Sequence, residues 1–209
     1  MRDLLWGVRR FQRDVYPRMR GLFDELDQGQ SPSTLFITCS DSRIVPSLIT
    51  STDPGELFVV RNAGNIVPPY DQGGGEAASI EFAVEALKVK DVVVCGHTGC
   101  GAMAALLNPD SCAGLPAVAN WIQLLQRVRD RLPSDQGDES AEDLLNLVVK
   151  ENVIAQLETL REHPAVGDAV EAGSLKLHGW VYSIDSGDVE IFDPEERTFA
   201  ALDSSSRAV

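Results

Sequence analysis

Three short apolar runs constrain the fold of this chain more than any other feature of its sequence. They are STLFITC at 33–39, ELFVVRN at 56–62 and DVVVCGH at 91–97. Each has the length of a strand, and the apolar middle of the third is typical of a buried parallel strand. Between the second and third runs, helical periodicity extends from Glu76 to Leu87. This alternation predicts an α/β fold with a central, mostly parallel sheet flanked by helices.

The remaining segments extend this pattern at both ends of the chain. Apolar residues recur at spacings of three and four over 2–29, which predicts an amphipathic helical arm with a break at Pro17. Helices are expected at 116–132 and 140–162, with the loop PSDQGDES between them. Residues 175–193 alternate around an Asp-Ser-Gly-Asp turn, which predicts a hairpin or a final edge strand. We expect one domain, 1–209, with its arm at 1–30 and a frayed tail at 204–209.

Composition excludes several classes of function. The formal net charge is -14, so the field of the protein repels nucleic acid and anionic lipid. Asp3 and Asp14 interrupt the basic N-terminal segment and no long apolar run follows it, so we expect neither a signal peptide nor a membrane span. Four cysteines in 209 residues do not resemble a disulfide framework. We therefore expect a cytoplasmic protein that binds neither nucleic acid nor membranes.

The segment CSDSR follows the first apolar run and carries three reactive groups, Cys39, Asp41 and Arg43. Alternate residues of an extended segment point to the same side, so these three side chains can share one small volume. The carboxyl ends of parallel strands are also where open α/β sheets bind their ligands.

A second group of candidate ligands, His97 and Cys100, ends the third apolar run. A helix predicted from Gly99 to Leu107 follows, and its dipole favours a thiolate at its start. Cys39, His97 and Cys100 together form a donor set that zinc accepts, with a fourth position left open for chemistry. The residues alone leave two alternatives, namely a structural zinc with Asp41 as fourth ligand and buried or redox thiols without a metal.

Three motifs carry a resemblance to a known family, namely CSDSR, GELFVVRNAGNIVPPY at 55–70 and GHTGCGAM at 96–103. Through these motifs the chain resembles the β-class carbonic anhydrases over essentially its whole length. The likeness is strongest to the plant-like and bacterial subgroup that includes cyanate-operon and carboxysomal enzymes. The resemblance implies a zinc lyase with one Zn²⁺ per chain, which interconverts carbon dioxide and bicarbonate. It also implies an intertwined homodimer or a higher even-numbered homo-oligomer, in which we expect the arm to pack on a partner subunit.

This resemblance gives Asp41 and Arg43 catalytic roles. Zinc lowers the pKa of a bound water toward ~7 and supplies a hydroxide that attacks carbon dioxide. Asp41 would accept a hydrogen bond from that hydroxide and orient it, and Arg43 would hold Asp41 ionised through a bidentate pair. If Arg43 releases Asp41, the carboxylate can become a fourth zinc ligand in a closed state.

Matching positions of the family also imply a substrate pocket formed by Gln30, Phe58, Ala63, Phe82 and Gly101. Gln30 would donate a hydrogen bond to a substrate oxygen, as would the Gly101 backbone N–H. Phe82 stands where many relatives have tyrosine, and Ala63 is smaller than the plant valine. We therefore expect a looser and less polar pocket.

In the bicarbonate-inhibited subgroup, a tryptophan three residues before the first cysteine ligand helps to form an allosteric anion site. This chain has Phe36 there, so we expect no such inhibition, although Arg61 and Tyr182 are present.

Other residues have plainer interpretations. Cys95 is expected in the core, Cys112 in a loop and His163 at a helix end, and His178 is either a structural histidine in a strand or a proton shuttle. Two other functions stay open, namely a related hydrolase of carbonyl sulfide or carbon disulfide and a catalytically silent module of a larger assembly.

Overall fold

The computed structural model describes residues 1–132 and 140–202, and the chain separates into two compact units, 1–31 and the chain from Pro32 onward. The first unit is the predicted helical arm. It contains α1 (Arg2–Arg10), a π-helical turn η1 (Phe11–Val15), a 3₁₀ turn η2 (Tyr16–Arg18) and α2 (Arg20–Leu26). The regular helix is interrupted around Pro17, as predicted, because proline has no backbone N–H and crowds the preceding turn.

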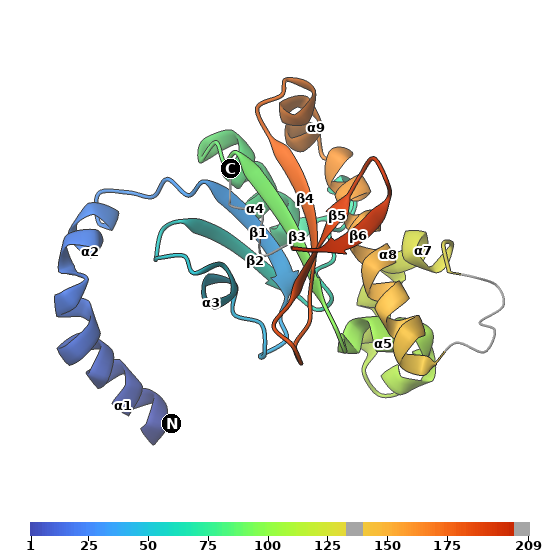
Figure 1. The fold of residues 1–209 in the computed structure, drawn as a ribbon, viewed down its shortest axis with the longest axis horizontal. Coiled ribbons are helices and arrows are strands. Elements are labelled where there is room, and N and C mark those ends of the chain that lie inside the picture. Colours follow the sequence, from blue (N-terminus) through green and yellow to red (C-terminus); the bar gives the residue numbers. More distant parts are fainter. Residues whose placement is uncertain (133–139, 203–209) are drawn as a thin grey trace. The chain divides into compact units, whose positions relative to one another are not determined.

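The second unit is built on one six-stranded sheet in the order β2-β1-β3-β4-β5-β6 (Figure 1). The first four of these strands are parallel and the last two pairings are antiparallel, which confirms the predicted mostly parallel sheet with an edge strand near the C-terminus. The strands are β1 (Thr34–Cys39), β2 (Leu57–Asn62), β3 (Asp91–His97), β4 (Lys176–Tyr182), β5 (Val189–Asp193) and β6 (Thr198–Ala201).

Helices connect and flank these strands. They are α3 (Pro46–Thr50), η3 (Tyr70–Gln72), α4 (Gly74–Glu81), η4 (Phe82–Ala86), α5 (Gly101–Leu107), η5 (Pro109–Cys112), α6 (Pro116–Trp121), η6 (Ile122–Leu125), α7 (Gln126–Arg129), α8 (Ala141–Arg161) and α9 (Pro164–Glu171). The α8 helix lies within one residue of its predicted bounds, and the Ser140 hydroxyl caps it by accepting from the Asp143 N–H at 3.1 Å.

The prediction of one continuous helix over 116–132 was wrong, because the segment divides into α6, η6 and α7. Ile122 and Leu125 begin and end the 3₁₀ turn η6, and both are buried. A 3₁₀ turn aligns residues three apart, so it directs both side chains into the core where a regular helix would spread them. The predicted loop at 133–139 and the tail at 204–209 lie outside the described residues.

The α8 helix packs closely against β3 and β4 at two glycines. A Cβ atom at Gly96 would lie 2.9 Å from a methyl group of Val153, and one at Gly179 would lie 2.8 Å from the other. Val153 and Val149 are buried with strand residues such as Val94 in the main core. These strand glycines therefore let α8 approach the sheet closely enough to bring its other side chains near the site described below.

The opposite face of the sheet carries a smaller apolar cluster of Phe36, Val93 and Cys95, with Trp180 packed against it. Cys95 is fully buried, which confirms its expected place in the core, and burial raises its pKa to about 12.

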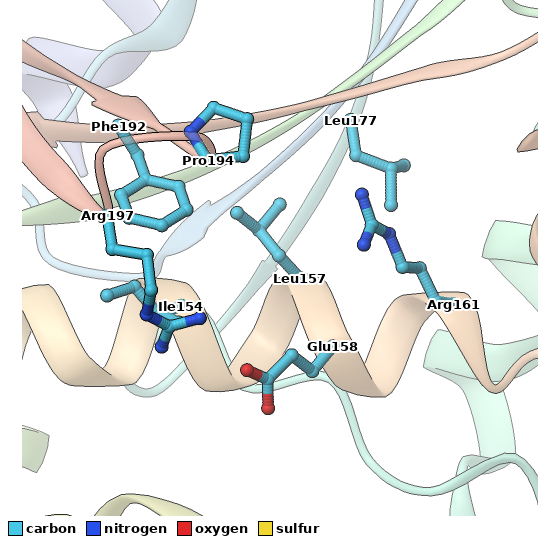
Figure 2. A pocket seen from close by; sticks show the side chains of 8 residues that line it. All are labelled: Ile154, Leu157, Glu158, Arg161, Leu177, Phe192, Pro194 and Arg197. Carbon is cyan, nitrogen blue, oxygen red and sulfur yellow. The ribbon is translucent and has the colours of Figure 1, made fainter.

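A small cavity of about 120 Å³ lies between α8 and the hairpin formed by β5 and β6. Figure 2 shows Leu157 and Arg161 rising from α8 toward Leu177, Phe192 and Pro194. None of the predicted site residues lines this cavity. Across residues 1–132 and 140–202, no helix is both long and apolar enough to span a membrane.

Candidate metal centre

Three potential metal ligands meet at one edge of the sheet. Cys39 is the last residue of β1 and His97 is the last residue of the neighbouring parallel strand β3. Cys100 follows three residues later, at the N-cap position of α5. Their ligand atoms all lie within 4.8 Å of one another, and all three side chains are buried. The structure thus brings together the three residues that the sequence singles out.

The His97 ring is arranged as that of a metal ligand. Its Nδ1 lies 2.9 Å from the Thr98 carbonyl oxygen, an acceptor that requires the ring proton to be on Nδ1. Its Nε2 therefore carries a free lone pair. That atom is buried and has no hydrogen-bond partner among the described residues, which is costly unless another group takes the lone pair. A metal ion between Nε2 and the two sulfur atoms would fill this role.

The two thiols strongly affect one another. The neighbouring Cys100 thiol, together with His97 and the Gly64 N–H, favours the thiolate of Cys39 and lowers its pKa. The same contact raises the pKa of Cys100, because a second negative charge would form beside the first, and burial adds to the effect. A divalent cation would remove this repulsion, so the pair can bind a metal as two thiolates.

Asp41 and Arg43 form an ion pair beside this cluster. Arg43 donates through Nε to Oδ1 at 2.9 Å and through Nη2 to Oδ2 at 2.7 Å, and its backbone N–H donates to Oδ1 at 3.0 Å. These hydrogen bonds hold the pKa of Asp41 well below its usual range. Oδ2 lies 4.0 Å from His97 Nε2, so an ionised carboxylate borders the candidate ligands.

Arg61 fixes the segment that carries these groups. Its guanidinium donates to the Cys39 carbonyl oxygen at 3.0 and 3.1 Å and to the Asp41 carbonyl oxygen at 2.8 Å. This role of Arg61 was not predicted from the sequence, where Arg61 was considered only in connection with an anion site. The alternation of β2 could have suggested it, because Arg61 and Val59 are exposed whereas Val60 and Asn62 are buried.

A second interaction that the sequence did not predict is a hydrogen bond from the Gly64 N–H to Cys39 Sγ, at 3.3 Å. Gly64 lies in the loop after β2 and has a φ of 82°, a conformation that glycine adopts without strain. Its carbonyl oxygen accepts a hydrogen bond from Asn152 of α8. The sequence signal for Asn152 is the presence of amides at 152 and 156 within an otherwise apolar helical stripe.

The expected pocket residues lie in several elements. Ala63 precedes Gly64 and borders a shallow pocket with Asn62, Glu76 and Trp121. Gly101 begins α5, where backbone N–H groups lack intrahelical acceptors.

Phe58 and Phe82 form an aromatic pair with their ring centroids 6.1 Å apart. Gln30 belongs to the N-terminal unit, and its contribution to the site stays a prediction.

The remaining cysteine and the other histidines lie elsewhere. Cys112 ends η5 and is buried. His163 precedes α9, and its Nε2 donates to the Pro68 carbonyl oxygen at 2.9 Å. His178 Nε2 lies 2.8 Å from Asp91, at the end of β3 opposite His97, which favours its structural interpretation over a direct proton shuttle.

The family model, the related sequences and the similar solved structures all indicate the same family. Residues 34–189 match the family model described as carbonic anhydrase. A carbonic anhydrase of Pseudomonas aeruginosa is 51% identical over 203 residues, which are 97% of this chain and 92% of the relative. The solved structure of the β-carbonic anhydrase CcaA has a TM-score of 0.93 at 41% identity and covers 97% of this chain and 99% of its own. A tetrameric β-carbonic anhydrase of Sordaria macrospora has a TM-score of 0.74 at 30% identity, covering 90% and 92% respectively.

Proposed function

This chain belongs to the β-carbonic anhydrases, and on that premise we propose that it catalyses the reversible hydration of carbon dioxide to bicarbonate and a proton. The observation that carries the proposal is the convergence of Cys39, His97 and Cys100 within 4.8 Å beside an ionised Asp41. Fold alone would not define an activity, whereas this donor set limits the chemistry strongly.

Cys39, His97 and Cys100 would hold one Zn²⁺ per chain. The donor set fits, since two sulfurs and an imidazole suit zinc and the buried His97 Nε2 has its lone pair available. When bound, the zinc supplies an activated water as a nucleophile near neutral pH. The Thr98 carbonyl oxygen fixes the His97 tautomer, so Nε2 would be the atom that binds the ion.

Asp41 would orient the attacking water by accepting a hydrogen bond from it. Its carboxylate can do so only while ionised, and Arg43 maintains that state through its bidentate contact. In this structure the carboxylate is bound to Arg43, so it would not serve as a ligand of the ion. A closed state in which Asp41 binds the metal requires this pair to break.

Carbon dioxide is small and apolar, so its binding surface needs few polar groups. We assign that surface to Phe58, Ala63 and Phe82, and assign hydrogen bonds to bicarbonate oxygens to Gln30 and the Gly101 N–H. The place of Gly101 as the first residue of α5 supports its assignment, because a backbone N–H at a helix start has no intrahelical acceptor and can donate to an anion.

The enzyme would act as a homo-oligomer in the cytoplasm. The amphipathic arm supports the homo-oligomer, since Leu4, Leu5 and Trp6 expose large apolar side chains that a partner subunit would cover. The tetrameric relative from Sordaria macrospora supports an even-numbered assembly.

Stopped-flow hydration of carbon dioxide at pH 7.0 and 8.5, on protein with measured zinc content, tests this function. Activity well above that of buffer with about one zinc per chain would support it. Zinc-loaded protein that is inactive at both pH values would contradict it. Turnover of carbon disulfide or carbonyl sulfide would then favour the related hydrolase, and inactivity toward these substrates would favour a silent module.

A further inference from the structure

The loop that follows β2 is irregular and yet buried, which makes its hydrogen bonds unusually important. Residues 64–68 are buried, and Gly64 and Asn65 both have positive φ values, 82° and 48°. Buried backbone groups need partners, because an unpaired one is costly. One of these groups, the Gly64 N–H, donates to Cys39 Sγ at 3.3 Å. The loop thus contacts a candidate metal ligand directly.

Both peptide groups that flank Gly64 are held by side chains from other elements. The peptide between Ala63 and Gly64 carries the N–H that reaches Cys39, and its carbonyl oxygen accepts from Trp121 Nε1 at 2.8 Å. The following peptide presents the Gly64 carbonyl oxygen to Asn152 Nδ2 at 3.0 Å. Trp121 and Asn152 therefore constrain the Gly64 amide from two sides.

A third side chain, Gln156, orients Asn152. Gln156 Nε2 donates to Asn152 Oδ1 at 2.8 Å, which turns the Asn152 amino group toward Gly64. Gln156 Oε1 in turn accepts from the Val67 N–H at 2.8 Å. Asn152 and Gln156 are 1% and 3% exposed, so water does not offer alternative partners.

Apart from the Val67 N–H, the rest of the loop is fixed by other residues. The Asn62 side chain exchanges two hydrogen bonds with the Ile66 backbone, at 2.7 and 2.8 Å, and His163 holds the Pro68 carbonyl oxygen. A Cβ at Gly64 would lie 2.8 Å from the Ala102 Cβ, so α5 packs on this residue as well. Loss of Trp121 or Asn152 should therefore act locally on the orientation of the Gly64 amide.

We propose that Trp121, Asn152 and Gln156 are positioning residues that hold the Gly64 N–H on the Cys39 sulfur and so set how strongly this sulfur donates electrons to the metal. The inference rests on the proposed zinc site. A hydrogen bond to a thiolate lowers the energy of its lone pairs, and such outer contacts tune a metal site as much as its ligands do. In a site with two thiolates, this bond offsets part of the charge that the sulfurs pass to the ion.

Cobalt(II) in place of zinc makes the effect visible, because the energy of thiolate-to-cobalt charge transfer reports the energy of the sulfur lone pairs. We would compare wild type with Asn152→Leu, which removes the donor to the Gly64 carbonyl oxygen, and Trp121→Phe, which removes the donor to the Ala63 carbonyl oxygen. Trp121 is only partly buried, so Trp121→Phe provides a test even if Asn152→Leu does not fold.

Thr159→Val is the matched control, since the Thr159 hydroxyl is buried on α8 and, within the described part of the chain, donates only to the Ala155 carbonyl oxygen of its own helix.

In both test variants the charge-transfer band should move to longer wavelength, because the Cys39 sulfur then donates more strongly. Affinity for cobalt and zinc should fall by about 10–100-fold, because the loop no longer holds that sulfur in its ligand position. Thr159→Val should match wild type in both measurements. Unchanged bands and affinities in the test variants, or an equal change in Thr159→Val, would overturn this inference but leave the proposed metal site standing. A wild-type protein that binds cobalt without a thiolate charge-transfer band would overturn the inference and the proposed metal site together.

Discussion

Replacing Gly96 with alanine should destabilise the protein, because α8 leaves no room for a side chain there. The new Cβ would lie 2.9 Å from Val153 Cγ2 and 3.1 Å from Val149 Cγ1, where ordinary contacts begin at 3.4 Å. Both valines are buried and their χ1 rotamers are stiff, so the helix itself must move by several tenths of an ångström. Overpacking of this kind costs about 1–3 kcal/mol.

The measurement is urea unfolding of wild type, Gly96→Ala, Val153→Ala and the double variant. Val153→Ala removes the closest methyl group, so the two substitutions should not act independently. The double variant should lose at least about 0.5 kcal/mol less free energy of unfolding than the two single variants lose together.

Gly75→Ala is the control, since a Cβ at that helix position meets none of the described residues within 4 Å and should not destabilise. The packing explanation would be refuted if the losses of free energy of unfolding in Gly96→Ala and Val153→Ala simply added in the double variant. Equal losses in Gly96→Ala and Gly75→Ala would also refute it.

Three further predictions concern catalysis, inhibition and alkaline stability. Asp41→Asn should lower carbon dioxide hydration by about 10²–10⁴-fold while the zinc content stays at one per chain, and loss of zinc would contradict its orienting role. Bicarbonate should not inhibit hydration sigmoidally, because Phe36 replaces the tryptophan of an anion site and Arg61 is engaged with backbone carbonyls; initial rates over a bicarbonate series test this. Burial raises the pKa of Cys95 to about 12, above its unfolded value, so the stability that its neutral form contributes is complete below pH ~9 and falls progressively as the pH rises toward 12. Urea unfolding between pH 8 and 11 should show the advantage of wild type over Cys95→Ala shrinking by about 1.4 kcal/mol per pH unit above 9, and a constant difference would argue against burial.

The sheet was predictable because its strands are short, apolar and bounded by distinct segments. Local pattern sufficed for β1, β2 and β3, whose apolar runs coincide with the observed strands within one residue. It also sufficed for α8, where a serine cap precedes a long periodic run. It failed over 116–132, where burial of Ile122 and Leu125 against the core selects a 3₁₀ turn that helical spacing does not reveal.

The donor set of the site was predictable for a similar reason. Cys39 and His97 end neighbouring parallel strands, and Cys100 follows three residues after His97. Local spacing and strand order therefore bring the three side chains together. The positioning network was not predictable, since Asn152 meets Gly64 across 88 residues of sequence. Contacts of that kind depend on how far α8 approaches the sheet, which is a property of the packed fold.

Adding zinc in steps to metal-free protein, with the rate of carbon dioxide hydration followed at each step, tests the central claim most directly. The rate should rise in proportion to added zinc and stop rising at one equivalent per chain. Cys100→Ser, which replaces one of the three proposed ligands, should need a large excess of zinc to reach any plateau. Hydration that persists without zinc, or tight binding of one zinc that leaves the rate at the level of buffer, would contradict the account.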